Sequence, residues 1–143
     1  MTNWLLLHYK LPSKPSALRV YIWRKLKRLG AILLHEAVWV LPDTPRTAEQ
    51  YQWLMAEIQE MGGNAFYWKA STILGEQGES IIEQFNEQVD MVYSNLLKRI
   101  DKPRADLQEI SQQYQQTASI DFFHSKLGNL VQEKLMSKRG ERP

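Results

Sequence analysis

The sequence predicts an α+β protein, in which a ferredoxin-like βαββαβ sandwich is followed by a C-terminal antiparallel helical extension. Two observations lead to this prediction. Hydrophobic patterns through residue 73 follow the order strand, helix, strand, strand, helix, strand, which is the split βαβ arrangement. Beyond that point the apolar residues recur at spacings of three and four, as in amphipathic helices. We therefore expect an α+β domain at 1–75, a helical extension packed on it at 76–137, and a disordered basic tail at 138–143.

The first strand is predicted at 3–11 and ends at Pro12. Both alternating sets of its side chains are apolar or aromatic, which indicates a strand buried on two faces. The following segment predicts a helix that is capped by Ser16 and ends at Gly30. Four apolar residues of this helix lie within about 80° of one another on a helical wheel: Leu18, Ile22, Leu26 and Leu29.

Two short strands are predicted next, at 31–35 and 37–41, with Glu36 as their tight connection. The last strand of the domain is predicted at 64–73. Helices of a ferredoxin-like sandwich cover only one face of the sheet, yet apolar side chains occur on both faces of these strands. Because an uncovered apolar face is unfavourable in water, we expect the helical extension to cover the second face.

The second helix of the domain begins at Thr44 and Pro45, since threonine is a good N-cap and proline is tolerated at the first helical position. Its apolar residues repeat at helical spacing: Tyr51, Leu54, Ile58 and Met61. Within the extension, the spacing of apolar residues predicts a long helix over 79–100, an antiparallel helix that begins near Leu107, and a final helix through 127–135.

Composition excludes several kinds of chemistry. The chain has no cysteine, so disulfides, thiolate metal sites and thiol nucleophiles are ruled out. The longest apolar run, Trp4 to Leu7, is far shorter than the roughly 20 residues that cross a bilayer. No basic stretch precedes this run, as a secretory signal would require. We expect a cytoplasmic protein with no membrane partner and no cofactor.

Charge is distributed unevenly along the chain. Residues 1–46 carry eight basic and two acidic side chains, a net charge of +6, whereas residues 47–137 carry a net charge of −6. Such a basic head favours either a polyanionic partner or contact with an acidic surface of the same or another copy. In one form of the second alternative, the protein is purely structural and its basic N-terminal segment docks on an acidic helix of a neighbouring copy. That helix bears Glu76, Glu79, Glu83, Glu87 and Asp90.

The basic residues of the first helix form the main candidate site. Arg19, Arg24, Lys27 and Arg28 lie outside the apolar arc of the helix, and Trp23 lies beside them. Arginine forks match tetrahedral oxyanions, and an aromatic ring at the edge of a basic face can stack a base. The five residues are therefore candidates for binding an anion or a nucleic acid. The same pattern also fits a solvated helix face with a tryptophan packed at an interface.

Histidines and carboxylates offer a second, weaker candidate. His8, His35 and Glu36 belong to one predicted sheet, and with Asp121 or His124 they could supply nitrogen and oxygen ligands to a divalent metal. None of them shows the i, i+4 spacing of a helical metal motif, so we favour structural or surface roles and predict no metal site.

Four motifs stand in a fixed order along the chain: Trp4-Leu5-Leu6-Leu7-x-Tyr9-x-Leu11-Pro12, Arg19 with Trp23-Arg24-x-Leu26-x-x-Leu29-Gly30, Val38-x-Val40-Leu41-Pro42, and Asp121-Phe122-Phe123. Their combination resembles the amino-terminal domain of the ChrB chromate-resistance family. The first three are also similar to the effector-side domain of PaaX-type repressors and, more distantly, to the ferredoxin-like CRISPR adaptation subunit. Six residues serve as family markers: Trp4, Tyr9, Pro12, Asp121, Phe122 and Phe123.

This resemblance implies a non-enzymatic regulatory module in chromate resistance, which acts in transcriptional regulation or sensing. It would be a homodimer that turns its basic helix toward DNA or an oxyanion. Full-length members of the family continue into a second, larger domain. We therefore expect this chain to be a truncated member, a natural single-domain relative, or one half of a split pair whose second domain is a separate protein. Within the motifs, Asp121 is open to two interpretations: a metal-binding or anion-relay carboxylate, or a helix cap beside two phenylalanines that anchor the tail.

A metal-dependent nuclease is the enzymatic alternative. Nuclease-type relatives of this fold resemble one another in an acidic residue near the end of the first strand. Here that strand ends Tyr9-Lys10-Leu11, and a lysine in place of the carboxylate argues against metal-dependent phosphodiester cleavage.

Overall fold

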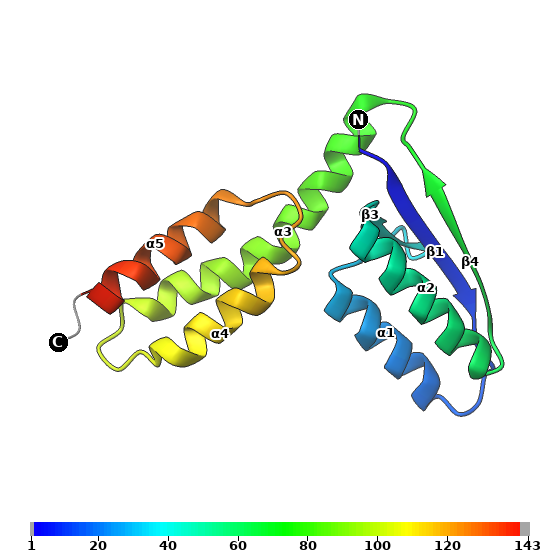
Figure 1. Ribbon diagram of the computed structural model, residues 1–143, viewed down its shortest axis with the longest axis horizontal. Coiled ribbons are helices and arrows are strands. Elements are labelled where there is room, and N and C mark those ends of the chain that lie inside the picture. Colours follow the sequence, from blue (N-terminus) through cyan, green and yellow to red (C-terminus); the bar gives the residue numbers. More distant parts are fainter. Residues whose placement is uncertain (1, 141–143) are drawn as a thin grey trace. The chain divides into compact units, whose positions relative to one another are not determined.

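In the computed structural model, which describes residues 2–140, the elements follow the predicted order (Figure 1). They are β1 (Trp4–Lys10), α1 (Ala17–Leu29), β2 (Ile32–Leu34), β3 (Val38–Pro42), α2 (Pro45–Glu60), β4 (Asn64–Ala70), α3 (Gly75–Ile100), α4 (Leu107–Ala118) and α5 (Lys126–Gly140). The chain divides into two compact units after Ser80, a residue inside α3.

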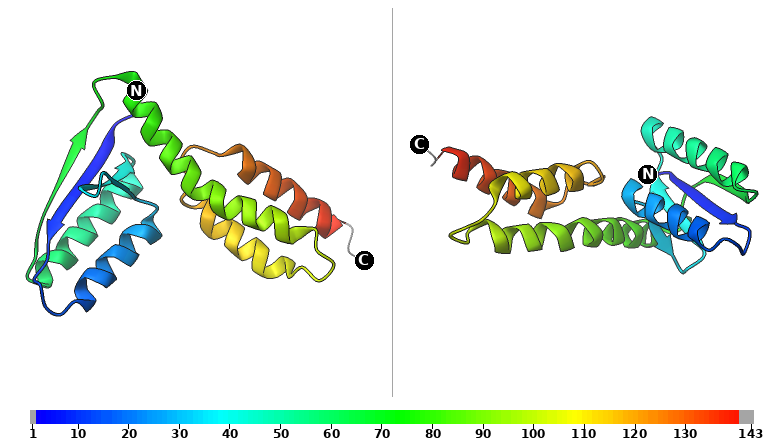
Figure 2. Two further views of the ribbon diagram at one scale, coloured as in Figure 1. Left: turned by 180° about the vertical axis from the view of Figure 1, so that it is seen from behind. Right: turned by 90° about the horizontal axis from the view of Figure 1, so that it is seen from below.

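The first unit contains a four-stranded antiparallel sheet in the order β2-β3-β1-β4. This order, reached through two helical crossovers, confirms the predicted ferredoxin-like fold. Figures 1 and 2 show α1 and α2 side by side over one face of this sheet. Leu7 of β1 pairs with Trp39 on one side and with Tyr67 on the other, so these residues share a face. The ring of Tyr51 on α2 contacts Tyr67, which identifies that face as the one under the helices.

Burial follows from this register. Alternating residues of the two central strands pack under the helices, because side chains two apart on a strand point to the same face. The fully or nearly buried core of this layer includes Leu5, Leu7, Trp39, Leu41, Ile22, Leu26, Tyr51, Leu54 and Ile58. On the opposite face Trp4 and Val40 are buried and His8 is half-buried, whereas Phe66 and Trp68 are exposed. The first strand is thus apolar on both faces, as predicted, but its second face is only partly buried.

Helix α1 begins without the predicted side-chain cap. Ser16 already has helical backbone angles (φ −63°, ψ −21°), and its side chain makes no capping hydrogen bond. Its carbonyl oxygen accepts from the N–H of Arg19 and the N–H of Val20 instead. The predicted end is correct: Gly30 adopts φ 86°, a left-handed conformation that glycine takes at little steric cost.

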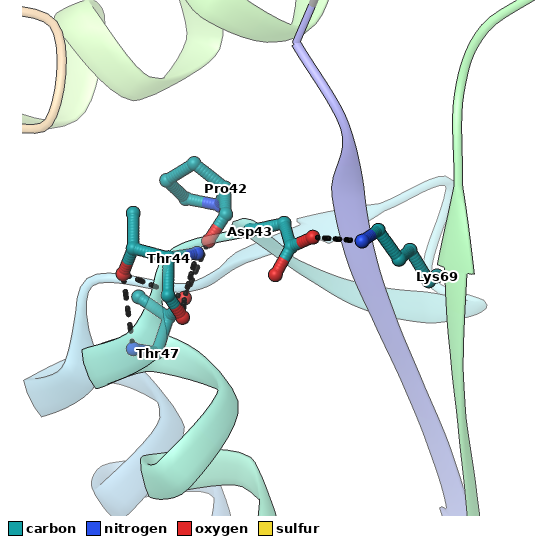
Figure 3. Close-up of polar contacts among 5 residues, drawn as sticks. All are labelled: Pro42, Asp43, Thr44, Thr47 and Lys69. Atoms are coloured by element: carbon teal, nitrogen blue, oxygen red, sulfur yellow. Dashed lines mark hydrogen bonds and ion pairs between the residues drawn. The ribbon is translucent and has the colours of Figure 1, made fainter.

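The start of α2 is held by a capping box (Figure 3). The Thr44 hydroxyl accepts from the N–H of Thr47 at 3.1 Å, and the Thr47 hydroxyl accepts from the N–H of Thr44 at 2.9 Å. The buried Thr47 hydroxyl also lies 2.6 Å from the carbonyl oxygen of Pro42, the last residue of β3. Asp43 forms an ion pair with Lys69 of β4, with 3.1 Å between Nζ and Oδ2. The helix thus begins at the predicted Thr44 cap, and these contacts join its start to two strands.

The connection between β2 and β3 is longer than expected. His35 and Glu36 both have positive φ (52° and 56°), and the N–H of Ala37 donates to the carbonyl oxygen of Leu34 at 3.0 Å. Two successive residues with positive φ are the mark of a type I′ hairpin turn. His35 is therefore part of the turn and not of the strand.

The second unit is built from α3 after Ser80, α4 and α5, which lie alongside one another (Figures 1 and 2). Its core consists of Val89, Tyr93, Leu96, Ile100, Ile110, Val131 and Leu135. Helix α5 continues to Gly140, so the predicted disordered tail is helical over 138–140; residues 141–143 lie outside the described part of the chain. The reason is pairing: Lys138 forms an ion pair with Asp101, and Arg139 donates to the hydroxyl of Ser111.

Candidate functional site

All five predicted binding residues lie on the exposed side of α1, where the helical repeat sorts them into two rows. Residues four apart are neighbours on a helix surface, with about 5–6 Å between their Cβ atoms. Arg19, Trp23 and Lys27 form one row, and Arg24 and Arg28 form the next. The tryptophan is thus aligned with Arg19 and Lys27, and the two remaining arginines stand together.

Arg24 and Arg28 line a surface hollow of about 470 Å³. Its other lining residues are Ala17, Val20, Tyr21 and Lys25. Within residues 2–140, neither arginine has an ion-pair partner, so both charges face this hollow uncompensated. A tetrahedral oxyanion or a backbone phosphate fits such a pair of arginine forks.

Lys25 borders the same hollow and was not among the predicted residues. Its Nζ atom lies 2.5 Å from Oε1 of Glu57 on α2, 3.3 Å from the Tyr21 hydroxyl and 5.4 Å from the centre of the Tyr21 ring. The hydrogen bond to Glu57 is the main reason that the pKa of Lys25 is raised. Glu57 is 32 residues away along the chain, so only the packing of α1 on α2 reveals the pair. Lys25 therefore offers an outside anion less uncompensated charge than Arg24 or Arg28.

The proposed metal ligands do not come together. His8 lies on β1, where its Nε2 atom accepts a hydrogen bond from the indole N–H of Trp68, and His35 lies in the β2–β3 turn. Over residues 2–140, no group of three histidine, aspartate or glutamate side chains is arranged to hold a metal ion. Lys10, at the position where the nuclease-type relatives carry a carboxylate, is exposed at the end of β1. The described helices also include none that could span a bilayer.

The Asp121-Phe122-Phe123 motif packs inside the second unit. Oδ2 of Asp121 accepts from the Tyr93 hydroxyl at 3.0 Å, and its carboxylate also accepts from the N–H of Ser125. Both phenylalanine rings contact the ring of Phe85, at centroid distances of 5.7 and 5.8 Å. Burial raises the pKa of the Tyr93 phenol, and the charge of Asp121 raises it further. This arrangement anchors the segment before α5. At the start of that helix the hydroxyl of Ser125, and not the carboxylate of Asp121, accepts from the N–H of Leu127.

The remaining family markers also have structural positions. Trp4 is buried in the sheet, and Pro12 follows the end of β1. Tyr9 is half-buried; burial raises the pKa of its phenol, and a hydrogen bond with Trp39 opposes that rise. The markers thus occupy structural positions in the fold.

Comparisons with known proteins agree with these motifs. A family model described as protein ChrB, N-terminal, matches residues 19–123, from the basic helix to the second phenylalanine of the late motif. Protein ChrB of Cupriavidus metallidurans is 34% identical over 65 residues, which cover 46% of this chain and 20% of that protein. The aligned segment thus spans about a fifth of the length of that curated relative. No solved structure shows a significant match. Since the family model covers well over half of its residues, the chain belongs to the ChrB N-terminal family.

Proposed function

We propose that this protein is a non-enzymatic regulatory module of a chromate-resistance system, which binds the phosphates of DNA or a smaller oxyanion on the basic face of α1. Membership of the ChrB N-terminal family supports the role in resistance. The observation that carries the binding surface is the hollow lined by Arg24 and Arg28, whose charges have no carboxylate partner in the described chain.

The physical case rests on how a polyanion is held. Phosphate contacts supply most of the affinity for DNA, and each contact releases condensed counterions from the duplex. Two adjacent arginines on an exposed helix face can both reach one backbone, and the second row, with Arg19 and Lys27, adds charge beside them. No requirement for a metal arises in this kind of binding.

The test compares the full chain with the double variant Arg24→Ala/Arg28→Ala in binding to a labelled DNA duplex over a series of salt concentrations. Because each phosphate contact contributes about 0.9 to the slope of log affinity against log salt, the double variant should lower that slope by about 1.8 and weaken binding. A matched control is Lys102→Ala/Arg104→Ala, which removes the same charge from exposed residues outside α1. If the α1 double variant keeps the wild-type affinity and slope, α1 is not the surface that binds DNA.

Because DNA phosphates and small oxyanions both present tetrahedral anionic groups, a second experiment distinguishes between them as the ligand. Calorimetric titration with chromate, and with sulfate as a non-oxidising equivalent, measures direct oxyanion binding. Loss of that heat in Arg24→Ala/Arg28→Ala, with unchanged DNA affinity, would assign the hollow to the oxyanion. Loss of DNA affinity without any oxyanion heat in the wild type would assign it to DNA.

The proposal includes a homodimer. One helix face contacts few phosphates, whereas two copies related by a two-fold axis double the contacts and match two half-sites. Sedimentation of the full chain, alone and with a duplex of increasing length, should show two protein copies per duplex. A stable 1:1 complex on every duplex length would contradict this part of the proposal.

A further inference from the structure

The sheet face opposite α1 and α2 carries three aromatic rings that the proposed function does not use. They belong to His8 on β1 and to Phe66 and Trp68 on β4, the edge strand of the sheet. His8 pairs directly with Phe66, and Trp68 is two residues further along β4, so all three point to the same side. Phe66 and Trp68 are each 53% exposed, which is a large share for apolar rings. We name these three residues the ring platform.

The three ring planes of the platform are nearly parallel. The indole N–H of Trp68 donates to Nε2 of His8 at 2.7 Å, and the two ring planes differ by only 12°. An N–H bond lies in the plane of its indole, and the lone pair of Nε2 lies in the plane of the imidazole. Both conditions hold together only if the rings meet edge to edge, in keeping with their centroid separation of 6.1 Å. The hydrogen bond thus fixes two rings side by side as one flat surface.

Phe66 extends this surface. Its plane is 19° from that of His8 and 19° from that of Trp68, at centroid distances of 5.7 and 6.1 Å. All three separations are similar, so the rings mark a triangle of nearly parallel planes. The 53% exposure of Phe66 and of Trp68 leaves part of both rings open to solvent.

Polar groups stand at one end of the platform. Lys10 pairs with Asn64, one step beyond the pair of His8 and Phe66 on the same face, and both are exposed. That step of two residues corresponds to about 6.6 Å along a strand. An ammonium group and an amide therefore lie within a nucleotide's length of the rings. A lysine at this place speaks against a second copy of the chain as the occupant, because the cores of protein interfaces are depleted of lysine.

We propose that the ring platform binds unpaired bases of single-stranded nucleic acid, with a base stacked on the rings and its phosphate beside Lys10. Exposed aromatic side chains on a four-stranded sheet are a general means of holding single strands, since every base has a π-face. In a duplex those faces are covered by neighbouring bases, so the platform selects single strands. This surface is separate from the basic face of α1, because the helices and the rings occupy opposite faces of the sheet.

The experiment measures fluorescence anisotropy of labelled 15-mers of oligothymidine and oligouridine titrated with the full chain. Stacking on one aromatic side chain is worth between about fivefold and about 150-fold in affinity, so Trp68→Ala should weaken binding by a factor in that range. The matched control is Trp53→Ala, which removes a tryptophan that is 67% exposed on α2 and lies outside the platform. This control should bind like the wild type. The two oligonucleotides show whether DNA or RNA is preferred.

A second variant guards against loss of folding. Phe66→Ala removes an exposed ring that makes no hydrogen bond within the platform, and it should weaken binding in the same direction as Trp68→Ala. The circular dichroism spectra of both variants should match that of the wild type. Neither variant should change the salt slope of duplex DNA binding, whereas Arg24→Ala/Arg28→Ala should lower it. The proposals for the two surfaces can therefore fail or succeed separately.

Three results would overturn the proposal. The first is no binding of either 15-mer by the wild type at the highest protein concentration. The second is wild-type affinity in both Trp68→Ala and Phe66→Ala. The third is a wild-type dimer that dissociates in Trp68→Ala while oligonucleotide affinity is unchanged, which would make a second copy of the chain the occupant of the platform.

Discussion

The hydroxyl of Tyr93 donates to Oδ2 of Asp121 across 3.0 Å and joins α3 to the segment that precedes α5. Tyr93 is completely buried, so its hydroxyl has no access to water as an alternative partner. The same carboxylate accepts from the N–H of Ser125. Asp121 therefore satisfies a buried donor and a loop N–H at once, which explains a carboxylate at this place in structural terms.

Asp121→Ala should destabilise the protein by about 1–3 kcal/mol, the usual cost of leaving a buried donor without a partner. Urea unfolding measures the loss. Asp121→Asn keeps an oxygen acceptor and should lose less stability. In a Tyr93→Phe background, which lacks the buried donor, Asp121→Ala should cost much less stability than in the wild type. DNA and oxyanion binding by the folded variant should stay at the wild-type level. A loss of binding at full stability would instead favour the anion-relay interpretation of Asp121.

Gly128 lies where a larger residue would strike this pair. A Cβ atom at position 128 would lie 2.9 Å from a Tyr93 ring carbon and 3.1 Å from Oδ2 of Asp121. Alanine normally stabilises a helix by about 1 kcal/mol relative to glycine, but overpacking costs typically 1–3 kcal/mol. We therefore expect Gly128→Ala to lower the melting temperature. Gly75→Ala, where an added Cβ meets nothing within 4 Å, is the control and should not lower it.

Alkaline pH should destabilise the protein through its buried tyrosines. Burial raises the pKa of Tyr51, whose hydroxyl donates to the carbonyl oxygen of Trp39 at 2.9 Å. Above about pH 10 the unfolded chain loses this proton while the folded chain keeps it, so the unfolded state binds fewer protons and the free energy of unfolding falls. The slope is about 1.4 kcal/mol per pH unit for each such tyrosine.

Tyr51→Phe should be less stable than the wild type at pH 8, because it lacks the hydrogen bond to Trp39. Since phenylalanine has no proton to lose, the difference should shrink as the pH rises from 10 to 11. Chemical denaturation at each pH measures it. A difference that stays constant over this range would contradict the raised pKa of Tyr51.

Glu57→Gln should strengthen polyanion binding. Removal of the carboxylate charge leaves Lys25 uncompensated beside Arg24 and Arg28, and one further phosphate contact would raise the salt slope by about 0.9. Glu60→Gln changes the net charge equally at an exposed position on α2 and should have a smaller effect. Equal gains in the two variants would mean that net charge, and not the hollow on α1, governs binding. The change in stability should stay within about 1 kcal/mol, as for other ion pairs near the surface.

Much of the first unit could be predicted because its signals are local. The period of two in β1, the period of 3.6 in α1 and α2, and the cap at Thr44 all act between residues a few positions apart. The order of elements then leaves few topologies, and the sheet order β2-β3-β1-β4 is the ferredoxin-like one. Local reasoning failed at Ser16, whose backbone is already helical, and at 138–140, where partners on other helices hold the last turn of α5.

The sequence by itself determined the fold class, the family and the basic face of α1, since these depend on which residue types recur at which spacing. Only the tertiary structure decided which charges on that face are compensated, because Lys25 meets Glu57 across 32 residues. The same holds for the ring platform: strand register places His8 beside Trp68, 60 residues later, and their hydrogen bond sets the two rings in one plane. Spacing along the chain reveals periodic faces, whereas pairs between distant elements exist only once those elements have packed.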